Sequence, residues 1–228
     1  NLSVKELSSV LTKITSVNPP LGVATMVPNS LGPGELLLHY GTEEQKEKYL
    51  PKLANGEFVP CFGLTGPNNG SDATGSIDEG YVTLEDGKKF VNVEVNKRYI
   101  TLAPVSNLIG LAFRLKDPNN ILDKGNEGVT VALIEKGEFG LRQETYHNPL
   151  NTGFPNGTLK GTLKIPLDNV IGGEENVGNG WKMLMECLAA GRGICLPATA
   201  NASSKVACFG VINYAKPVSY THLTLPTT

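Results

Sequence analysis

The chain has 228 residues, 40% hydrophobic and 18% charged, which is enough apolar material for one large domain or two small ones. Twenty Lys and Arg residues stand against 22 Asp and Glu residues, for a formal net charge of -2. No basic stretch alternates with aromatic residues, so the composition argues against a nucleic-acid partner.

Other binding classes also find little support in the sequence. The longest strongly apolar run, residues 100–113, is too short for a helix that crosses a bilayer. No His, Cys, Asp or Glu spacing resembles a metal site, so we expect no metal. The cysteines form no Cys-x-x-Cys pair, and we expect them to be small buried hydrophobes in a reducing compartment: Cys61, Cys187, Cys195 and Cys208.

The beginning of the chain indicates a fragment and a helical region. The chain starts at Asn1, without Met and without a signal-like segment, which we interpret as a fragment. Apolar residues then recur at helical spacing, and Thr42 with Gln45 has the pattern of a capping box at the start of a helix. We predict an incomplete N-terminal α domain over residues 1–57.

From Phe58 the hydrophobic period changes to two, which is typical of strands. Asp86-Gly87 separates two such runs and predicts a tight hairpin, in which Val91, Val93 and Val95 share one face. Further β-rich runs at 108–115, 129–134 and 159–165 follow without intervening helices. The pattern predicts an antiparallel β domain over residues 58–172.

Helical spacing returns after residue 172. Gly191, Gly193 and Pro197 should weaken this helix locally. We predict the start of a truncated C-terminal α domain over residues 173–216, and therefore an α+β fold in the order α, β, α. Residues 217–228 lose the helical pattern, and we hypothesise that this tail is non-native.

Several motifs carry a family resemblance. Residues 64–72, Leu-Thr-Gly-Pro-Asn-Asn-Gly-Ser-Asp, are similar to the acyl-CoA dehydrogenase signature, although Gly66 stands where Glu or Ser is common and Asn69 where Ala is usual. Segments 31–35, 40–51, 96–104, 148–151 and 178–193 match in the same order. The chain therefore resembles an acyl-CoA dehydrogenase of the bacterial long-chain fatty-acid β-oxidation type, with its N-terminal helices, middle β domain and C-terminal helical bundle.

The resemblance implies FAD as cofactor and two sets of site residues. The residues implied for FAD are Phe62, Gly63, Leu64, Thr65, Gly70, Ser71, Tyr99, Ile100 and Thr101. Those implied for acyl-CoA are Ser71, Ala189, Ala190, Gly191 and Arg192. On the residues alone, the glycine-rich segment also fits an ordinary β-turn, Tyr99 a core aromatic and Arg192 a solvated surface residue.

No residue of the chain matches the position of the family's catalytic base. In the family a carboxylate stands late in the helical domain or just before the helix arginine, and here the second position is Gly191. Glu186 lies on a different side of the same helix, so we assign no catalytic residue.

The implied activity is dehydrogenation of medium- or long-chain acyl-CoA to trans-2-enoyl-CoA in fatty-acid β-oxidation. An electron-transfer flavoprotein would accept the electrons, and the parent would be a homo-oligomer in the bacterial cytoplasm, with membrane association left open. The fragment itself is expected to be inactive. Two alternatives stay open: a non-catalytic flavin- or acyl-CoA-binding fragment, and an acyl-CoA oxidase of the same fold.

Overall fold

The computed structural model describes residues 2–28, 32–75 and 77–216. The tail that the sequence marks as non-native, residues 217–228, lies outside the described residues. The order of elements is helices, then strands, then helices, which confirms the predicted α+β fold. The domain boundaries after residues 57 and 172 stay predictions.

Local chemistry explains the amino-terminal helices, which are α1 (Val4–Val17), α2 (Pro19–Met26), α3 (Pro33–Tyr40) and α4 (Glu43–Ala54). Helix α4 begins with the predicted capping box: Thr42 accepts a hydrogen bond from the Gln45 amide, and the Gln45 side chain accepts one from the Thr42 amide. Gln45 also forms hydrogen bonds with a segment that is distant in the sequence: its Nε2 donates to the Val170 carbonyl, and its Oε1 accepts from the Gly172 amide. This side chain therefore ties α4 to the end of the β region.

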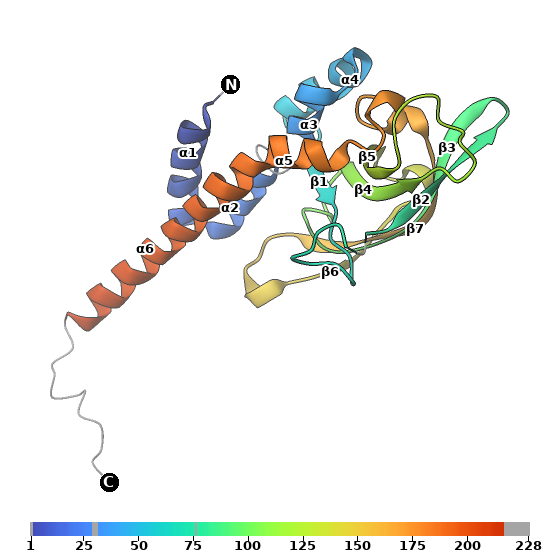
Figure 1. Cartoon of the computed structure of the whole chain (residues 1–228). Coiled ribbons are helices and arrows are strands. Elements are labelled where there is room, and N and C mark those ends of the chain that lie inside the picture. Colours follow the sequence, from blue (N-terminus) through green and yellow to red (C-terminus); the bar gives the residue numbers. More distant parts are fainter. Residues whose placement is uncertain (1, 29–31, 76, 217–228) are drawn as a thin grey trace, which may run out of the picture.

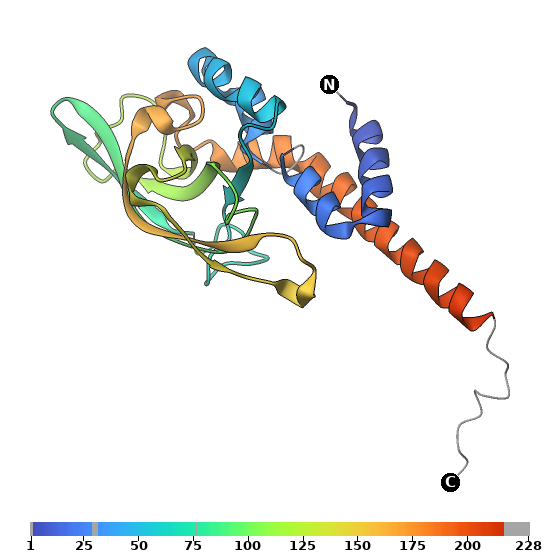
Figure 2. The ribbon, with the colours of Figure 1, turned by 180° about the vertical axis from the view of Figure 1, so that it is seen from behind.

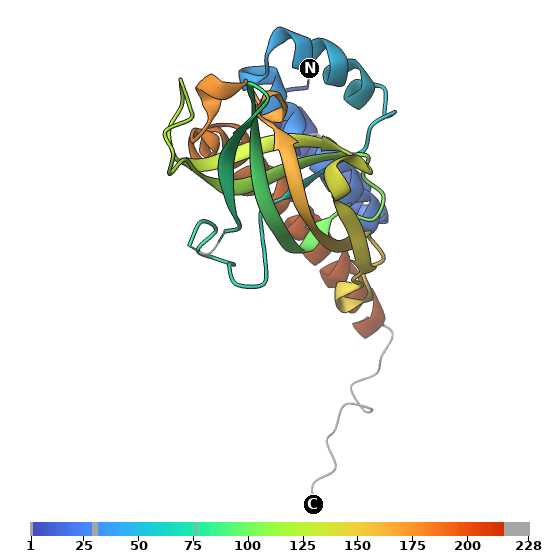
Figure 3. The ribbon, with the colours of Figure 1, turned by 90° about the vertical axis from the view of Figure 1, so that its right-hand side faces the viewer.

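The β region is one curled sheet (Figure 3). Its strands are β1 (Pro60–Gly63), β2 (Glu79–Glu85), β3 (Lys88–Thr101), β4 (Leu108–Lys116), β5 (Gly128–Glu135), β6 (Arg142–Tyr146) and β7 (Asn156–Pro166). The predicted hairpin is confirmed: β2 and β3 pair antiparallel around Asp86 and Gly87, both with positive φ. Val91, Val93 and Val95 are all buried, as the alternation predicts.

The sheet differs from the prediction in one respect, because it is mixed rather than purely antiparallel. One edge of β4 pairs with β5 along its length, whereas its other edge pairs in parallel with β1 and then with β2. Parallel neighbours need long connections, and β1 reaches β4 only after the β2–β3 hairpin has intervened. A period of two marks each strand but does not reveal the direction of its neighbour.

Helices cover part of the sheet and extend beyond it (Figures 1 and 2). A cluster that includes Leu36, Leu37, Leu133, Leu184 and Leu188 joins α3 and α5 (Gly180–Ala190) to β4 and β5. A π-helical turn, η6 (Gly191–Cys195), connects α5 to the long helix α6 (Leu196–Ala215), which lies against α1 and α2. The predicted weak point of the last helix is therefore this π turn.

Candidate functional site

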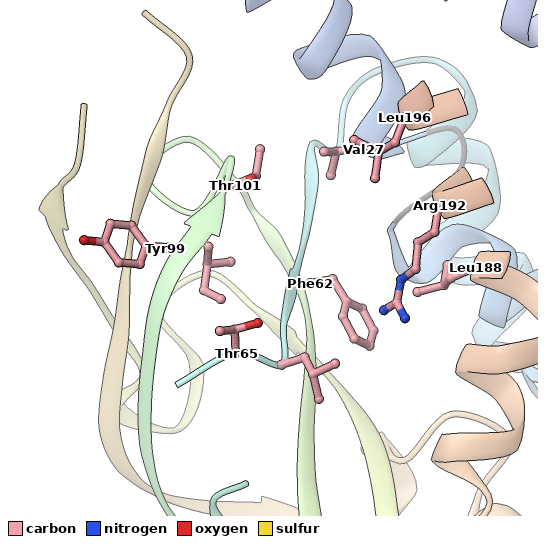
Figure 4. Close-up of a pocket in the computed structure, with 10 residues that line it drawn as sticks. Val27, Phe62, Thr65, Tyr99, Thr101, Leu188, Arg192 and Leu196 are labelled. Atoms are coloured by element: carbon pink, nitrogen blue, oxygen red, sulfur yellow. The ribbon is translucent and has the colours of Figure 1, made fainter. Parts of the chain in front are cut away.

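A cavity of about 210 Å³ opens where the sheet meets the carboxy-terminal helices (Figure 4). Strand β1 contributes Phe62, the loop after it contributes Leu64 and Thr65, and the end of β3 contributes Tyr99, Ile100 and Thr101. Val27, Leu188, Arg192 and Leu196 line the helical side. The cavity is small beside the roughly 300–1,000 Å³ of drug-sized pockets, so it suits one ring system of a larger ligand.

A β-bulge shapes the strand side of the cavity. The pairing of β3 with β7 shifts its register between Lys97 and Ile100, and Tyr99 lies there with a φ of 58°. A left-handed backbone is costly for a bulky residue and is often found at functional sites. The Tyr99 ring packs 4.8 Å from the His147 ring, and the Arg98 guanidinium lies 4.7 Å from its centroid. These contacts hold a half-exposed aromatic ring at the rim.

The glycine-rich segment after β1 is anchored on the same strand. The Arg98 amide donates a hydrogen bond to the Thr65 carbonyl over 3.0 Å. Within the segment, Asn69 Oδ1 accepts the Gly66 amide at 2.5 Å, and Asn69 Nδ2 donates to the Ala73 carbonyl at 3.0 Å. The segment is thus an organised loop rather than a simple turn.

Arg192 brings positive charge to the helical side. It belongs to the π turn η6, and its guanidinium points toward Phe62 in Figure 4. Among the residues that the structure describes, no carboxylate lies within salt-bridge distance of it. The turn therefore presents a cation to the cavity that is available to an anionic or carbonyl group.

The structure brings together most of the residues that the sequence nominated. Six of the nominated flavin residues and the nominated arginine line one cavity: Phe62, Leu64, Thr65, Tyr99, Ile100, Thr101 and Arg192. Gly63 is buried one position away, whereas Gly70 and Ser71 lie exposed in the loop and do not line the cavity. Ala189 is exposed on α5 and Gly191 is buried at the start of η6, and neither lines the cavity. The Ala190 side chain is outside the described set.

Three lining residues were missed by the sequence interpretation: Val27, Leu188 and Leu196. Leu188 carries a signal, because it follows Leu184 at helical spacing on a buried face. Val27 directly follows α2 within a Pro- and Gly-rich stretch, and no local pattern marks it. Leu196 directly follows the π turn. Because that turn interrupts the α-helical spacing, the sequence pattern does not reveal which side of the helix Leu196 faces.

No carboxylate lines the cavity among the described residues. The nearest candidate in sequence, Glu186, accepts a hydrogen bond from the Tyr40 hydroxyl, which links α5 to α3. That hydrogen bond, together with burial, raises the pKa of Tyr40 to about 12. Glu186 therefore contributes a contact between helices α5 and α3.

Two properties of the described residues concern membranes and metals. No described helix combines the length and apolar character required to cross a bilayer. Nor do three or more His, Cys, Asp or Glu side chains of the described part of the chain gather in a way that could hold a metal ion.

Known proteins resemble this chain in sequence and in fold. The model of the acyl-CoA dehydrogenase N-terminal domain matches residues 1–57. An acyl-CoA dehydrogenase of Bacillus subtilis (strain 168) is 31% identical over 206 residues, which are 90% of this chain and 51% of that protein. The chain belongs to the acyl-CoA dehydrogenase family.

Two further relatives extend the comparison. A protein of Proteus mirabilis named HemX is 43% identical over 98 residues, 42% of this chain and 58% of that protein. The structure of an acyl-CoA dehydrogenase from Bacillus anthracis, complexed with FAD, superposes with a TM-score of 0.78 at 22% identity, over 96% of this chain and 36% of that one. The chain spans little more than half the length of the curated relatives from B. subtilis and P. mirabilis.

Proposed function

We propose that this chain forms the flavin-facing part of an FAD-dependent acyl-CoA dehydrogenase that converts medium- or long-chain acyl-CoA to trans-2-enoyl-CoA in fatty-acid β-oxidation. The observation that carries this proposal is the meeting of residues 62–65 and 99–101 at one cavity, opposite Arg192. These segments are far apart in sequence, and both belong to motifs that resemble the flavin segments of the family. By the same resemblance, an electron-transfer flavoprotein accepts the electrons and the parent protein is a homo-oligomer.

The residues around the cavity fit a flavin ring. Phe62, Leu64, Ile100, Leu188 and Leu196 offer apolar contact to a flat aromatic system, and the Thr65 and Thr101 side chains add hydroxyl groups. Asn156 pairs with Thr101 across β3 and β7, and its buried Oδ1 has no hydrogen-bond partner among the described residues. Asn156 does not itself line the cavity, so this buried acceptor lies next to the ligand site only through its strand partner Thr101.

When bound, FAD supplies the hydride acceptor of the reaction. This chain's own residues orient the reactants and exclude water. The apolar walls lower the local dielectric, which strengthens hydrogen bonds and charge interactions inside the cavity. Arg192 would hold an anionic or carbonyl group of the acyl-CoA, and Tyr99 would pack along one side of the ring system.

A base must remove the proton next to the thioester carbonyl, and the described lining residues include no carboxylate. We therefore propose that the base is supplied by sequence other than residues 2–28, 32–75 and 77–216. The same observation favours the second candidate function, a flavin- or acyl-CoA-binding unit without catalysis of its own.

Flavin bleaching under anaerobic conditions separates these functions. Two purified proteins would be compared: this chain, and the protein encoded by the full genomic reading frame that contains it. Each is loaded with FAD and mixed with palmitoyl-CoA or octanoyl-CoA without oxygen, and the flavin absorbance is followed. We expect both proteins to bind FAD, and we expect acyl-CoA to bleach the flavin of the protein encoded by the full reading frame. Failure of both to bind FAD would contradict the proposed function, and rapid peroxide formation in air would identify an oxidase instead.

A further inference from the structure

Lys97 places an ammonium group in the core of the sheet. On β3 the inward row Val91, Val93 and Val95 continues to Lys97, whose side chain is 0% exposed. Lysine is almost never fully buried unless it is paired. Its Nζ lies 2.9 Å from Asp78 Oδ2, and the Asp78 side chain is 16% exposed.

Stability alone does not explain this pair. Burial lowers the pKa of Lys97, and the neighbouring Asp78 carboxylate opposes that shift, so the pair is buried at a desolvation cost. Replacement of a buried ion pair by apolar residues of similar volume is often neutral or stabilising.

The pair closes the glycine-rich loop after β1. The loop leaves β1 at Gly63, where an added Cβ would lie 3.7 Å from Lys97 Cγ, and it ends at Asp78, just before β2. Asp78 Oδ2 also accepts the Asn96 amide at 3.1 Å.

The neighbouring residue of β3 fixes the beginning of the loop, because the Arg98 amide donates to the Thr65 carbonyl at 3.0 Å. Three consecutive residues of β3, 96–98, thus hold both ends of the segment that carries Leu64 and Thr65. The strand then continues directly into Tyr99, Ile100 and Thr101, which line the same cavity.

We propose that the Lys97–Asp78 ion pair is a positioning device that fixes the loop segments 64–75 and 77–78 relative to residues 99–101, and so aligns the two halves of the cavity for the flavin ring. This inference rests on the proposed function for the identity of the ligand. The geometry of the loop itself does not depend on that identity.

The test uses the full chain and the double variant Lys97→Met with Asp78→Asn. Methionine keeps an unbranched chain of similar volume, and the asparagine Oδ1 can still accept the Asn96 amide. Asp78 also keeps its backbone contact to β4, where its carbonyl accepts the Arg114 amide at 2.8 Å. Lys89→Met is the matched control, because Lys89 lies on the same strand and pairs with Asp123 and Glu174 away from the cavity.

Three measurements are made on each protein: thermal unfolding, the Kd for FAD from flavin fluorescence, and hydrogen exchange of the amides in residues 64–75. We expect the double variant to melt close to the wild type, to bind FAD about tenfold more weakly and to exchange loop amides about tenfold faster. The β4 and β5 amides and the Lys89→Met variant should keep wild-type values for exchange and affinity.

Wild-type affinity and wild-type loop exchange in a stably folded double variant would overturn the proposal. If the double variant melts much earlier, Lys97→Met alone decides by the same exchange measurement, because the remaining Asp78 carboxylate is partly exposed and still accepts the Asn96 amide. If the wild type does not bind FAD, the proposed function fails, while loop exchange still decides whether the ion pair positions the loop.

Discussion

Asn69 accepts the amide hydrogen of Gly66 through its Oδ1 at 2.5 Å, and the two residues are the ones that depart from the family signature. A Cβ added at Gly66 would lie 3.0 Å from this Oδ1 and 2.9 Å from the Asn96 carbonyl oxygen. A larger residue at position 66 is therefore crowded from two sides, by the Asn96 backbone and by the Asn69 side chain. The two departures are thus coupled through one hydrogen bond and one close contact.

Substitution of this pair should be non-additive. Gly66→Ser forces the loop away from β3, and Asn69→Ala leaves the Gly66 amide without its acceptor, so each should lower the free energy of unfolding by about 1–3 kcal/mol. The double variant should cost less than the sum by about 0.5 kcal/mol or more, measured by denaturant unfolding. Gly70→Ala is the stability control, since a Cβ there meets open space. Strict additivity of the two single variants would refute the coupling.

The features that could be predicted from sequence are those that one short segment encodes. The Asp86-Gly87 hairpin and the Thr42–Gln45 capping box depend on a few adjacent residues, and both are present. The parallel neighbours of β4 and the contribution of Val27 to the cavity depend on contacts between distant segments, and no local pattern encodes them. The family motifs nominated most of the cavity because they mark both distant segments at once.

Two variants of Tyr99 should separate the cost of its left-handed backbone from the contribution of its ring to binding. Tyr99→Gly and Tyr99→Ala both remove the ring, but only glycine adopts the φ of 58° without strain. We expect the free energy of unfolding of the glycine variant to be about 0.5–1 kcal/mol higher than that of the alanine variant. The affinity for FAD should be reduced in both variants. Equal stability of the two variants would show that the bulge relaxes around this residue.

Glu174 gives a pH-dependent contribution to stability. Burial would raise its pKa, but the Lys89 ammonium and the Lys124 and Asp123 amides outweigh burial and lower the pKa below its ordinary value. A carboxyl with a lowered folded-state pKa contributes stability above its unfolded-state pKa, and this contribution is lost as the pH falls through the folded-state pKa.

Glu174→Gln should therefore lower the free energy of unfolding by about 1–2 kcal/mol at neutral pH, and the difference should shrink in acid. Urea unfolding at a series of pH values measures both effects. Glu85→Gln, which removes an exposed pairing with Lys164, should cost less than about 1 kcal/mol. A Glu174→Gln penalty that stays constant with pH would contradict the assignment.

The cysteines should react in the order of their exposure. Cys208 is exposed, Cys187 is half-buried with a pKa raised to about 11 by burial and two nearby carboxylates, and Cys61 and Cys195 are buried. Burial raises the pKa of Cys61 to about 12, which keeps it in the unreactive thiol form. A thiol reagent should label Cys208 first in the folded chain and Cys61 only after unfolding. Early labelling of Cys61 would place β1 outside the core.

We propose that the cavity between β1, β3 and η6 receives the flavin ring. FAD titration of the wild type, Thr65→Trp and Thr162→Trp tests it most directly. Thr65 lines the cavity and is exposed, so an indole there fills the space with little disturbance of the core, whereas Thr162 is an exposed residue of β7 outside the cavity. We predict saturable quenching of flavin fluorescence by the wild type and by Thr162→Trp, and at least about tenfold weaker binding by Thr65→Trp. Equal affinity of all three proteins for FAD, or no binding by the wild type, would contradict the claim.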